Sequence, residues 1–442
     1  MKRRDFVKAL SAAVLSGSNS LWADDGIDSA GEIIKDAKPT YRGGTPYTKD
    51  GKIIQPQREI PVIRDTDVLV VGGGCAGVIA ALAARRAGVK VTLVERYGCF
   101  GGLWTAGLVL PVLATHKKTP AGRIKMIHGI GDELLARIHK VRNGTIYYSD
   151  SAPQDALTDP EITKSLIADM LREEGVDILL HSWVTNAVMD GTDVKGAIFE
   201  SKSGCHAVRS KVVVDASGDG DLYDAAGAEN VRHIHRIGLV HRLGNMGDAT
   251  SIKGLKLGNK TPTAGVNWVN MMGPYGDGLD VATLTQMELD DRQAIWASLM
   301  KIQNNEQTKN VFLLDVASQL GVRASRTLAG MHEMSLDEAL AGKKHDDVVG
   351  VGGVYTFIKN HPVQIPYGAL VPRRINNVLA AGRCVAADNK MMNYTRLIGP
   401  CLLTGQAAGA AAALAVQTKT NVRDVSIPRL QGLLKRQNVF LG

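Results

Sequence analysis

The sequence has few cysteines, and none of them forms a recognisable ligand or redox motif. Cys75, Cys99, Cys205, Cys384 and Cys401 form neither a C-x-x-C nor a C-x-x-C-H pattern. A zinc ribbon, a thioredoxin-like dithiol and a covalently attached c-type haem are therefore excluded. We expect most of these cysteines to be small, buried, apolar residues.

Other absences exclude further classes of protein. No apolar run is long enough for a stable membrane span, and the Ala and Gly content of the short run Leu402–Val416 suits a buried helix. Dense basic runs with interleaved aromatic residues are missing, so the sequence does not indicate a nucleic-acid partner. His233, His235 and His241 have no acid or cysteine at ligand spacing, so we expect no metal site.

The first 23 residues are typical of an address and not of a folded segment. Lys2, Arg3 and Arg4 precede a mild apolar run, Ala9–Leu15, and the segment ends at Ala23. It resembles a twin-arginine export signal, although Lys2 stands where Ser or Thr is usual, and a disordered basic terminus is the alternative. Its removal would lower the formal net charge from +8 to +5, because it holds four basic residues and one Asp. The sequence therefore predicts a periplasmic or exported protein.

The strongest positive signal lies in residues 67–95. This segment reads as an apolar strand, a glycine turn, an alanine-rich helix and a second apolar strand that ends at Glu95. Gly72 permits the tight turn, Gly74 lets the backbone approach a pyrophosphate, and Gly77 lets the helix pack closely on the strand. The helix N-terminus favours an anion, and Glu95 lies where an acid accepts hydrogen bonds from ribose hydroxyls. The segment therefore predicts a dinucleotide site.

Four further segments favour FAD as the dinucleotide. Gly101-Gly102 supplies a second close backbone approach, and the strand 212–214 runs into the turn Asp215-Ala216-Ser217-Gly218-Asp219-Gly220-Asp221. A third strand and turn occupy residues 377–384. The sequence GPCLLTGQAAG at 399–409 would place a helix N-terminus at the pyrimidine edge of isoalloxazine, where its dipole stabilises the negative charge of reduced flavin.

Together with the GVRASR sequence at 321–326, these segments resemble the FAD-dependent oxidoreductase family, whose members carry GGGxAG, LGG, DAxGDGD, GxRxSR and AGRC…GQAAG blocks. The resemblance covers roughly residues 60–415. It implies an α/β fold: a glutathione-reductase-like, Rossmann-type FAD domain of the two-dinucleotide-binding-domain kind, with an inserted substrate domain. The residues expected to bind FAD are Gly72, Gly74, Cys75, Ala76, Gly77, Glu95, Arg96, Gly101, Gly102, Val184, Ala216, Ser217, Gly218, Gly382, Arg383, Cys401 and Leu402.

The chain is expected to divide into five parts. These are a signal peptide (1–23), an N-terminal arm (24–64), the first part of the FAD domain (65–235), a substrate or cap domain (236–365) and the second part of the FAD domain (366–442). Within them we expect a helix at 159–175, strand-like runs at 178–189, 194–200 and 206–214, and a loop at 350–355 that is not a second nucleotide site.

The catalytic residues are less clear. The family commonly has a histidine in the loop that precedes Arg396, but residues 385–395 contain none, so a histidine acid/base there cannot be carried over. Asp388, Lys390 and Tyr394 are alternatives. Arg396 resembles the arginine that binds a substrate carboxylate in fumarate-reductase-like flavoenzymes, and an internal salt bridge is the equal alternative. Arg323 and Arg326 either bind FAD phosphate or substrate, or bridge the domains. The candidate catalytic residues are Arg396, Tyr394, Asn389 and His361.

These features predict a periplasmic FAD-dependent dehydrogenase that transfers hydride between a small polar organic substrate and flavin N5. A flavin-based C=C reductase of fumarate-reductase-like type and a non-catalytic FAD electron carrier are the alternatives. The sequence has no second dinucleotide fingerprint and no haem motif. The expected electron acceptor is therefore a separate quinone, carrier protein or oxygen.

Overall fold

The computed structural model describes residues 45–120, 122–147, 155–247, 251–359 and 361–442, all of which belong to one compact unit. The expected signal peptide and the arm as far as residue 44 lie outside the described residues. The rest of the expected arm contains a short hairpin of β1 (Tyr47–Lys49) and β2 (Lys52–Ile54). The first strand of the main sheet then begins at Val62, three residues before the expected start of the FAD domain.

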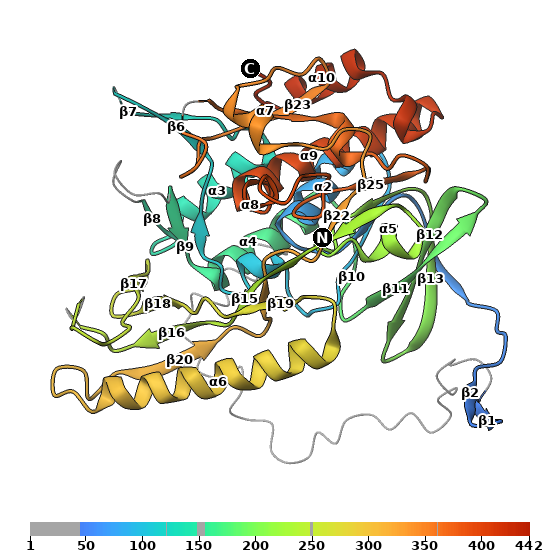
Figure 1. Ribbon diagram of the computed structural model, residues 1–442. Helices are drawn as coiled ribbons and strands as arrows, with labels where there is room; N and C mark the ends of the chain where they lie inside the picture. The colour runs from blue at the N-terminus through green and yellow to red at the C-terminus, as the bar shows by residue number, and fades with distance from the viewer. Residues whose placement is uncertain (1–44, 121, 148–154, 248–250, 360) are drawn as a thin grey trace, which may run out of the picture. The chain divides into compact units, whose positions relative to one another are not determined.

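The glycine turns follow strands of a seven-stranded sheet (Figure 1). Its strands are β3 (Val62–Val71), β4 (Val91–Val94), β10 (Asp177–Leu179), β11 (Trp183–Asp190), β12 (Asp193–Ser201), β13 (Gly204–Asp215) and β25 (Val378–Ala380). β10, β4, β3 and β13 pair in parallel in that order, and β25 pairs in parallel with the end of β13. β12 and β11 continue the sheet in the antiparallel sense. The mixed α/β class predicted from the sequence is confirmed.

Two helices pack backbone to backbone beside this sheet: α2 (Cys75–Arg86) and α9 (Ile398–Thr418). A Cβ atom on Gly405 would lie 2.2 Å from the carbonyl oxygen of Ala76, and one on Gly409 would lie 2.1 Å from that of Ala80. Only glycine permits this approach. Among the described helices, α9 alone has the length and apolar composition of a membrane span, but it is buried in the protein core. The sequence-based expectation of a buried helix is confirmed.

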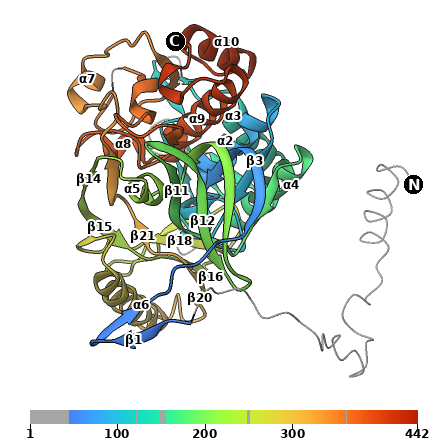
Figure 2. The same cartoon turned by 90° about the vertical axis from the view of Figure 1, so that its right-hand side faces the viewer.

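The chain between β13 and β25 builds smaller sheets. The strands of two of them are β15 (Ile234–Gly238), β16 (Val240–Gly244), β17 (Asn259–Lys260), β18 (Asn267–Asn270), β19 (Tyr275–Asp277), β20 (Phe312–Val316) and β21 (Gly321–Val322). They pair in the orders β17-β18-β16-β20 and β19-β15-β21. The long helix α6 (Val281–Gln303) lies beside β20 in both views (Figures 1 and 2). Its Leu299 and Ile302 pack against Leu243 and Val269 of the larger sheet.

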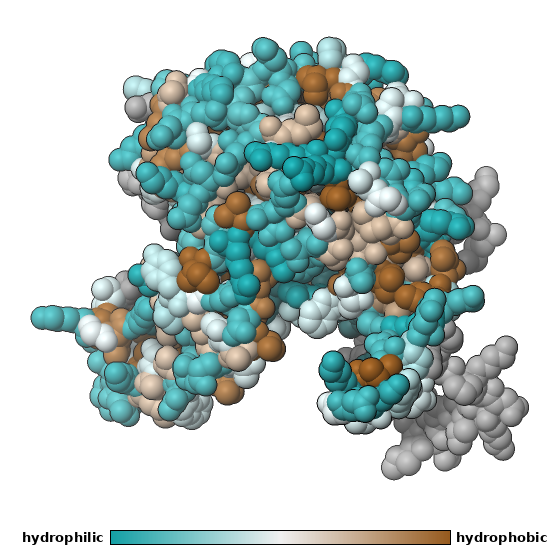
Figure 3. Space-filling view, turned by 45° about the vertical axis from the view of Figure 1, so that its right-hand side comes forward, coloured by the Kyte–Doolittle hydropathy of each residue, from teal (hydrophilic) through white to brown (hydrophobic). Residues whose placement is uncertain are grey.

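The remaining elements surround these two parts. They are η1 (Gly102–Trp104), β5 (Pro111–Val112), β6 (His116–Thr119), β7 (Gly122–Lys125), α3 (Ile130–Lys140), β8 (Thr145–Tyr147), β9 (Ala156–Thr158), α4 (Pro160–Glu173), α5 (Asp221–Ala225), β14 (Asn230–Arg232), β22 (Arg326–Leu328), α7 (Leu336–Leu340), β23 (Val348–Gly352), β24 (Val363–Pro366), η2 (Tyr367–Leu370), α8 (Met392–Thr395), η3 (Val422–Asp424) and α10 (Ile427–Arg436). On the face shown in Figure 3, hydrophilic side chains cover most of the surface and hydrophobic ones lie in small groups.

Most of the local expectations hold, and two are wrong. The helix expected at 159–175 is α4, and Asp159 caps it by accepting hydrogen bonds from the N–H groups of Glu161 and Ile162, both at 3.0 Å. The run 178–189 is not one strand, because His181 takes a left-handed φ of 54° between β10 and β11. Half of the loop expected at 350–355 is strand: residues 350–352 belong to β23, which pairs with β24 and packs on α9, where a Cβ on Gly350 would lie 3.3 Å from Leu403.

Candidate functional site

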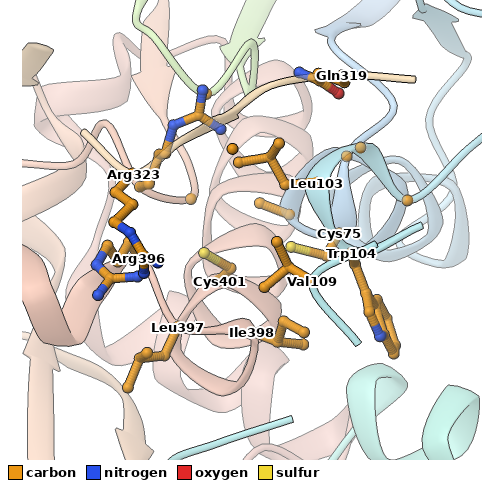
Figure 4. A pocket seen from close by; sticks show the side chains of 18 of the residues that line it. Cys75, Leu103, Trp104, Val109, Gln319, Arg323, Arg396, Leu397, Ile398 and Cys401 are labelled. Carbon is orange, nitrogen blue, oxygen red and sulfur yellow. The ribbon is translucent and has the colours of Figure 1, made fainter. Parts of the chain in front are cut away.

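A cavity of about 290 Å³ lies where the chain leaves the carboxyl ends of β3, β13 and β25 (Figure 4). Ligand sites in parallel α/β sheets occupy this position. We call its lining residues outside the cap the turn side: Gly72, Gly74, Cys75, Ala76, Glu95, Arg96, Tyr97, Gly101, Gly102, Leu103, Trp104, Val109, Pro111, Leu113, Ala216, Ser217, Gly218, Ala381, Gly382, Arg383, Arg396, Leu397, Ile398 and Cys401. The cap side consists of Gly238, Val240, Trp268, Asn270, Gln319, Gly321, Arg323 and Tyr355.

Helix α2 begins at this cavity with its backbone open to it. Gly74 is the N-cap residue, and in the described part of the chain no side chain caps the helix and its first turn holds no acid. A Cβ on Gly74 would meet no described atom within 4 Å, whereas one on Gly77 would lie 1.8 Å from the carbonyl oxygen of Gly72. Gly74 therefore leaves room for a ligand at the helix N-terminus, and Gly77 serves the close packing of helix on turn. The N–H groups there attract an anion.

Glu95 ties the end of β4 to the first glycine turn. One carboxylate oxygen accepts a hydrogen bond from the N–H of Gly73 at 2.6 Å, and the other accepts one from the N–H of Tyr97 at 2.8 Å. Burial raises the pKa of Glu95, and these two hydrogen bonds offset part of that effect. A carboxylate has about four acceptor sites, so Glu95 keeps capacity for ligand hydroxyls.

The second glycine turn, which follows β13, is held by Asp215. Its Oδ1 accepts hydrogen bonds from the N–H and the hydroxyl of Ser217 at 3.0 and 2.7 Å. Its Oδ2 accepts bonds from the N–H groups of Leu222 and Tyr223 at 3.0 and 2.9 Å. Asp215 is fully buried, and burial raises its pKa. These four bonds fix the shape of residues 216–220 before any ligand binds.

Two arginines brace the same turn from outside it. Arg383 donates to Asp219 at 2.7 Å. Burial lowers the pKa of Arg383, but the charge and hydrogen bond of Asp219 outweigh this effect and raise it. Arg326 pairs with Asp221 and Asp224 at 3.2 and 3.0 Å. Of the two alternatives weighed for Arg326, the structure therefore favours the bridging one.

The residues of the cavity fit a dinucleotide. Gly74 and Gly102 lie side by side, since a Cβ on Gly102 would be 3.0 Å from the Cα of Gly74, and both line the cavity. Among the described residues, three buried polar atoms on the lining have no partner: Nε of Arg383, Nε of Arg396 and Oε1 of Gln319. Buried polar atoms are normally satisfied, so these atoms indicate that a polar ligand completes the site.

Most residues predicted to bind FAD line this cavity, with three exceptions. Val184 lines a smaller neighbouring hollow, of about 40 Å³, which shares Gly72, Glu95, Arg96 and Ser217 with the cavity. Gly77 lies behind the turn, where its role is packing. Leu402 does not line the cavity, and its side chain packs against Gly131 of α3, where a Cβ would lie 2.9 Å from it.

Of the four candidate catalytic residues, the structure brings Arg396 to the cavity. The other three candidates do not line it. Tyr394 is fully buried, its hydroxyl donates to the carbonyl oxygen of Gly353 at 2.7 Å, and burial raises its pKa. Asn389 is exposed in the loop before α8. His361 is also exposed and lines a separate hollow beside Leu340 and Lys359.

Arg396 and Arg323 carry charge into the cavity without an acid beside them. Arg396 follows α8, and burial together with the charge of Arg323 lowers its pKa to about 10. Burial and the charge of Arg236 lower the pKa of Arg323. Neither forms an ion pair with an acid within the described ranges. The internal salt bridge that was the alternative for Arg396 is therefore not observed.

Sequence reasoning missed almost the whole cap side and the apolar part of the turn side. Trp268 and Gln319 come from segments without a motif, so no signal marks them in the sequence. Leu103 and Trp104 directly follow Gly101-Gly102 and could have been found from that position. The indole N–H of each tryptophan donates to a residue that does not line the cavity. Trp268 donates to the carbonyl oxygen of Leu108 at 2.6 Å, and Trp104 donates to the Thr158 hydroxyl at 2.8 Å.

The histidines weighed as a metal cluster do not converge. His233 Nε2 lies 2.7 Å from the Thr327 hydroxyl, and His235 Nε2 donates to Asn393 at 3.1 Å. In the part of the chain that the structure describes, one other group, His332, Glu338 and His345, brings ligand atoms within 4.8 Å of one another. Glu338 in that group is paired with Lys343.

Comparison with known proteins gives a consistent result. The family described as FAD dependent oxidoreductase matches residues 67–235 and 241–434. Thiamine thiazole synthase of Methanococcoides burtonii is 28% identical over 158 residues, which is 35% of this chain and 57% of that protein. Digeranylgeranylglycerophospholipid reductase 2 of Methanopyrus kandleri is 28% identical over 153 residues, 34% of this chain and 37% of that protein. The chain thus spans about half the length, or less, of these curated relatives.

Solved structures are more distant. A geranylgeranyl bacteriochlorophyll reductase-like protein of Thermoplasma acidophilum is 15% identical with a TM-score of 0.46, covering 84% of this chain and 83% of that one. The p-nitrophenol 4-monooxygenase of Pseudomonas putida is 14% identical with a TM-score of 0.47, covering 84% and 86%.

Proposed function

Because the chain belongs to the FAD-dependent oxidoreductase family, we propose that it transfers hydride between a small polar organic substrate and flavin N5. One observation carries this proposal. The glycine turns, which fit a dinucleotide, and the polar cap side line the same cavity. A dinucleotide held by the turns does not itself need the cap side. A cofactor and a small substrate would meet in that cavity.

The chain is a FAD-dependent oxidoreductase, and we propose that its turn side holds the FAD. The open N-terminus of α2 at Gly74 would hold the diphosphate, and Glu95 would accept hydrogen bonds from the ribose. Helix α9 starts at the same cavity with Leu397 and Ile398, and its dipole would favour negative charge on the pyrimidine edge of the flavin. When bound, FAD supplies the two-electron acceptor or donor. The glutathione-reductase-like arrangement of the FAD domain is part of this proposal.

The residues around the rest of the cavity would position the substrate and exclude water. Leu103, Val109 and Trp268 present apolar surface, and Arg323 and Arg396 offer charge on the same lining. Tyr355 is the cap-side group with a hydroxyl that can exchange a proton, so it replaces Tyr394 as our candidate for acid/base work. An electron carrier without a substrate has no use for this polar cap side.

Direction of electron flow separates the two enzyme hypotheses. The hypothesis of a C=C reductase rests on Arg396 as the group that binds a substrate carboxylate. An arginine in that role would serve a dehydrogenase equally well. In both, the electron partner is a separate quinone, carrier protein or oxygen. We further propose export by the twin-arginine route, which carries folded, loaded proteins. Replacement of both Arg3 and Arg4 by Lys should retain the protein in the cytoplasm, and an unchanged periplasmic yield would contradict this part.

Anaerobic spectroscopy of the purified, FAD-loaded protein tests the proposed function. We expect the flavin absorbance to bleach on addition of one compound class in a panel of alcohols, amines and hydroxy acids. A reductase would instead show reoxidation of photoreduced flavin by an activated alkene. A flavin that responds to neither panel, but exchanges electrons with a carrier protein, would favour the electron-carrier alternative.

A further inference from the structure

We propose that the cavity binds an oxyanion between Arg323 of the cap side and Arg396 of the turn side, so that the substrate carries a carboxylate or a comparable anionic group. This inference rests on the proposed function for the identity of the ligand as a substrate. The binding of the anion itself can be tested without turnover.

The two arginines come from distant parts of the chain and reach one place. Arg323 follows β21 in the cap, and Arg396 follows α8 close to the start of α9. Figure 4 shows their side chains next to each other on one side of the cavity. They are also close in electrostatic terms, because the charge of Arg323 contributes to the lowered pKa of Arg396. Two like charges in a half-buried position repel each other, and an anion between them removes that penalty.

Other arginines of the site provide an internal comparison. Arg383 lines the same cavity and is neutralised by Asp219 at 2.7 Å, with both side chains largely buried. Arg326 is neutralised by Asp221 and Asp224. The chain therefore supplies acids to the arginines that hold its own turns. Within the described residues it supplies none to Arg323 and Arg396, and Nε of Arg396 is buried without a partner.

The neighbouring titratable groups do not provide the missing negative charge. His235 accepts a hydrogen bond at Nδ1 from the N–H of Arg236 at 2.8 Å and donates from Nε2 to Asn393, a pattern that requires the neutral ring. Burial and the charges of Arg396 and Arg323 lower its pKa further. Arg236 stacks on Tyr275 and adds a third positive charge nearby. Tyr355, on the same lining, acts in the opposite direction and raises the pKa of both Arg323 and Arg396, but it is a phenol and not a carboxylate.

The shape of the donors indicates the class of anion. A guanidinium presents parallel N–H groups that match two oxygens of a carboxylate or phosphate, and two guanidiniums can hold both faces of such a group. The phosphates of FAD are the competing occupant. We assign those to the N-terminus of α2, since Gly74 keeps that position open.

Calorimetry on the FAD-loaded protein tests the assignment. We would titrate acetate, malonate, inorganic phosphate and neutral malonamide into wild type, Arg323→Met, Arg396→Met and Arg396→Lys. Arg292→Met on the exposed face of α6 is the matched control, since it removes an exposed arginine that does not line the cavity. We expect at least one oxyanion to bind and malonamide not to bind. Each Met variant should weaken the anion about tenfold or more, Arg396→Lys should retain part of the affinity, and the control should match wild type.

The flavin spectrum separates the possible failures. Anion affinity that is unchanged in both Met variants would overturn the proposal. So would loss of FAD from both variants together with no anion binding to the wild type, because the arginines would then serve the cofactor. A protein that binds the anion through both arginines, yet whose flavin is neither bleached nor reoxidised by any compound of the two panels, would contradict the proposed function and leave the oxyanion site standing. Binding of phosphate but not of malonate would identify the anion as a phosphate rather than a carboxylate.

Discussion

Glycines and backbone shape the turn side of the cavity, whereas side chains from scattered segments shape the cap side. Gly72, Gly74, Gly102, Gly218 and Gly382 all line the turn side, and the carboxyl ends of β3, β13 and β25, which lead into these turns, are buried. The cap side presents Trp268, Asn270, Gln319 and Arg323 from four positions in a part of the chain with small sheets. A cofactor shared by many proteins can be held by backbone geometry, while a substrate must be recognised by side chains.

The largest effect should come from substituting the glycines that pack behind the turn side. Gly77→Ala places a methyl group 1.8 Å from the carbonyl oxygen of Gly72, and Gly405→Ala places one 2.2 Å from that of Ala76. We expect each to lower the free energy of unfolding by about 4 kcal/mol or more, or to prevent folding, as backbone overlap cannot relax cheaply. Denaturant midpoints measure this. Gly432→Ala in α10, where a Cβ would meet no described atom closer than 3.7 Å, is the control and should stabilise by up to about 1 kcal/mol.

Gly74→Val separates ligand binding from folding on the same side. The new side chain would enter open space at the start of α2, so the apoprotein should unfold at the wild-type denaturant concentration. FAD affinity should fall by about 3 kcal/mol, roughly a hundredfold, because the side chain occupies the diphosphate path. Fluorescence titration with FAD checks this. A variant that binds FAD as well as wild type would show that the first glycine turn is not the diphosphate site.

His241 should make the cap side sensitive to acid. It is buried in β16, and burial together with the charge of Lys256 lowers its pKa from 6.5 to about 4. Below pH 6.5 His241 of the unfolded chain binds a proton, whereas His241 of the folded chain binds one only near pH 4. The stability that the neutral, buried His241 contributes is therefore lost as the pH falls from 6.5 to 4. The loss should reach about 3 kcal/mol. His241→Leu should flatten the profile; equal acid sensitivity in the variant would contradict the assignment.

Asp221 should act in the opposite direction on the turn side, with a smaller effect. Burial and the charges of Asp219 and Asp215 raise its pKa from 3.8 to about 6. The folded chain therefore holds a proton that the unfolded chain has released between those values, and the fold gains stability as the pH falls from 7 to 4. Its side chain is 38% exposed, so solvent screening limits the gain to about 1 kcal/mol. Asp221→Asn should remove this slope; a variant whose stability still rises on acidification would point to another group.

What the sequence could predict follows the same division. The strand, turn and helix at 67–95 could be predicted because each glycine meets a specific requirement of the backbone. In the structure Gly74 has open space beside it and Gly77 is closely packed, as predicted. Tyr394 could not be judged from its position near Arg396, because it lies two residues earlier in the chain and its hydroxyl donates to Gly353, outside the cavity lining. Trp268 and Gln319 reach the site through tertiary folding of short strands, which no local pattern records.

A crystal structure of the FAD-loaded protein with malonate would test the central claim most directly. The account predicts the diphosphate at the start of α2, the ribose at Glu95, and the malonate between Arg323 and Arg396 with no cofactor phosphate on either arginine. Density that places the diphosphate against Arg323 and Arg396, and leaves the N-terminus of α2 without a ligand, would contradict the assignment of the glycine turns to the cofactor and of the two arginines to the substrate.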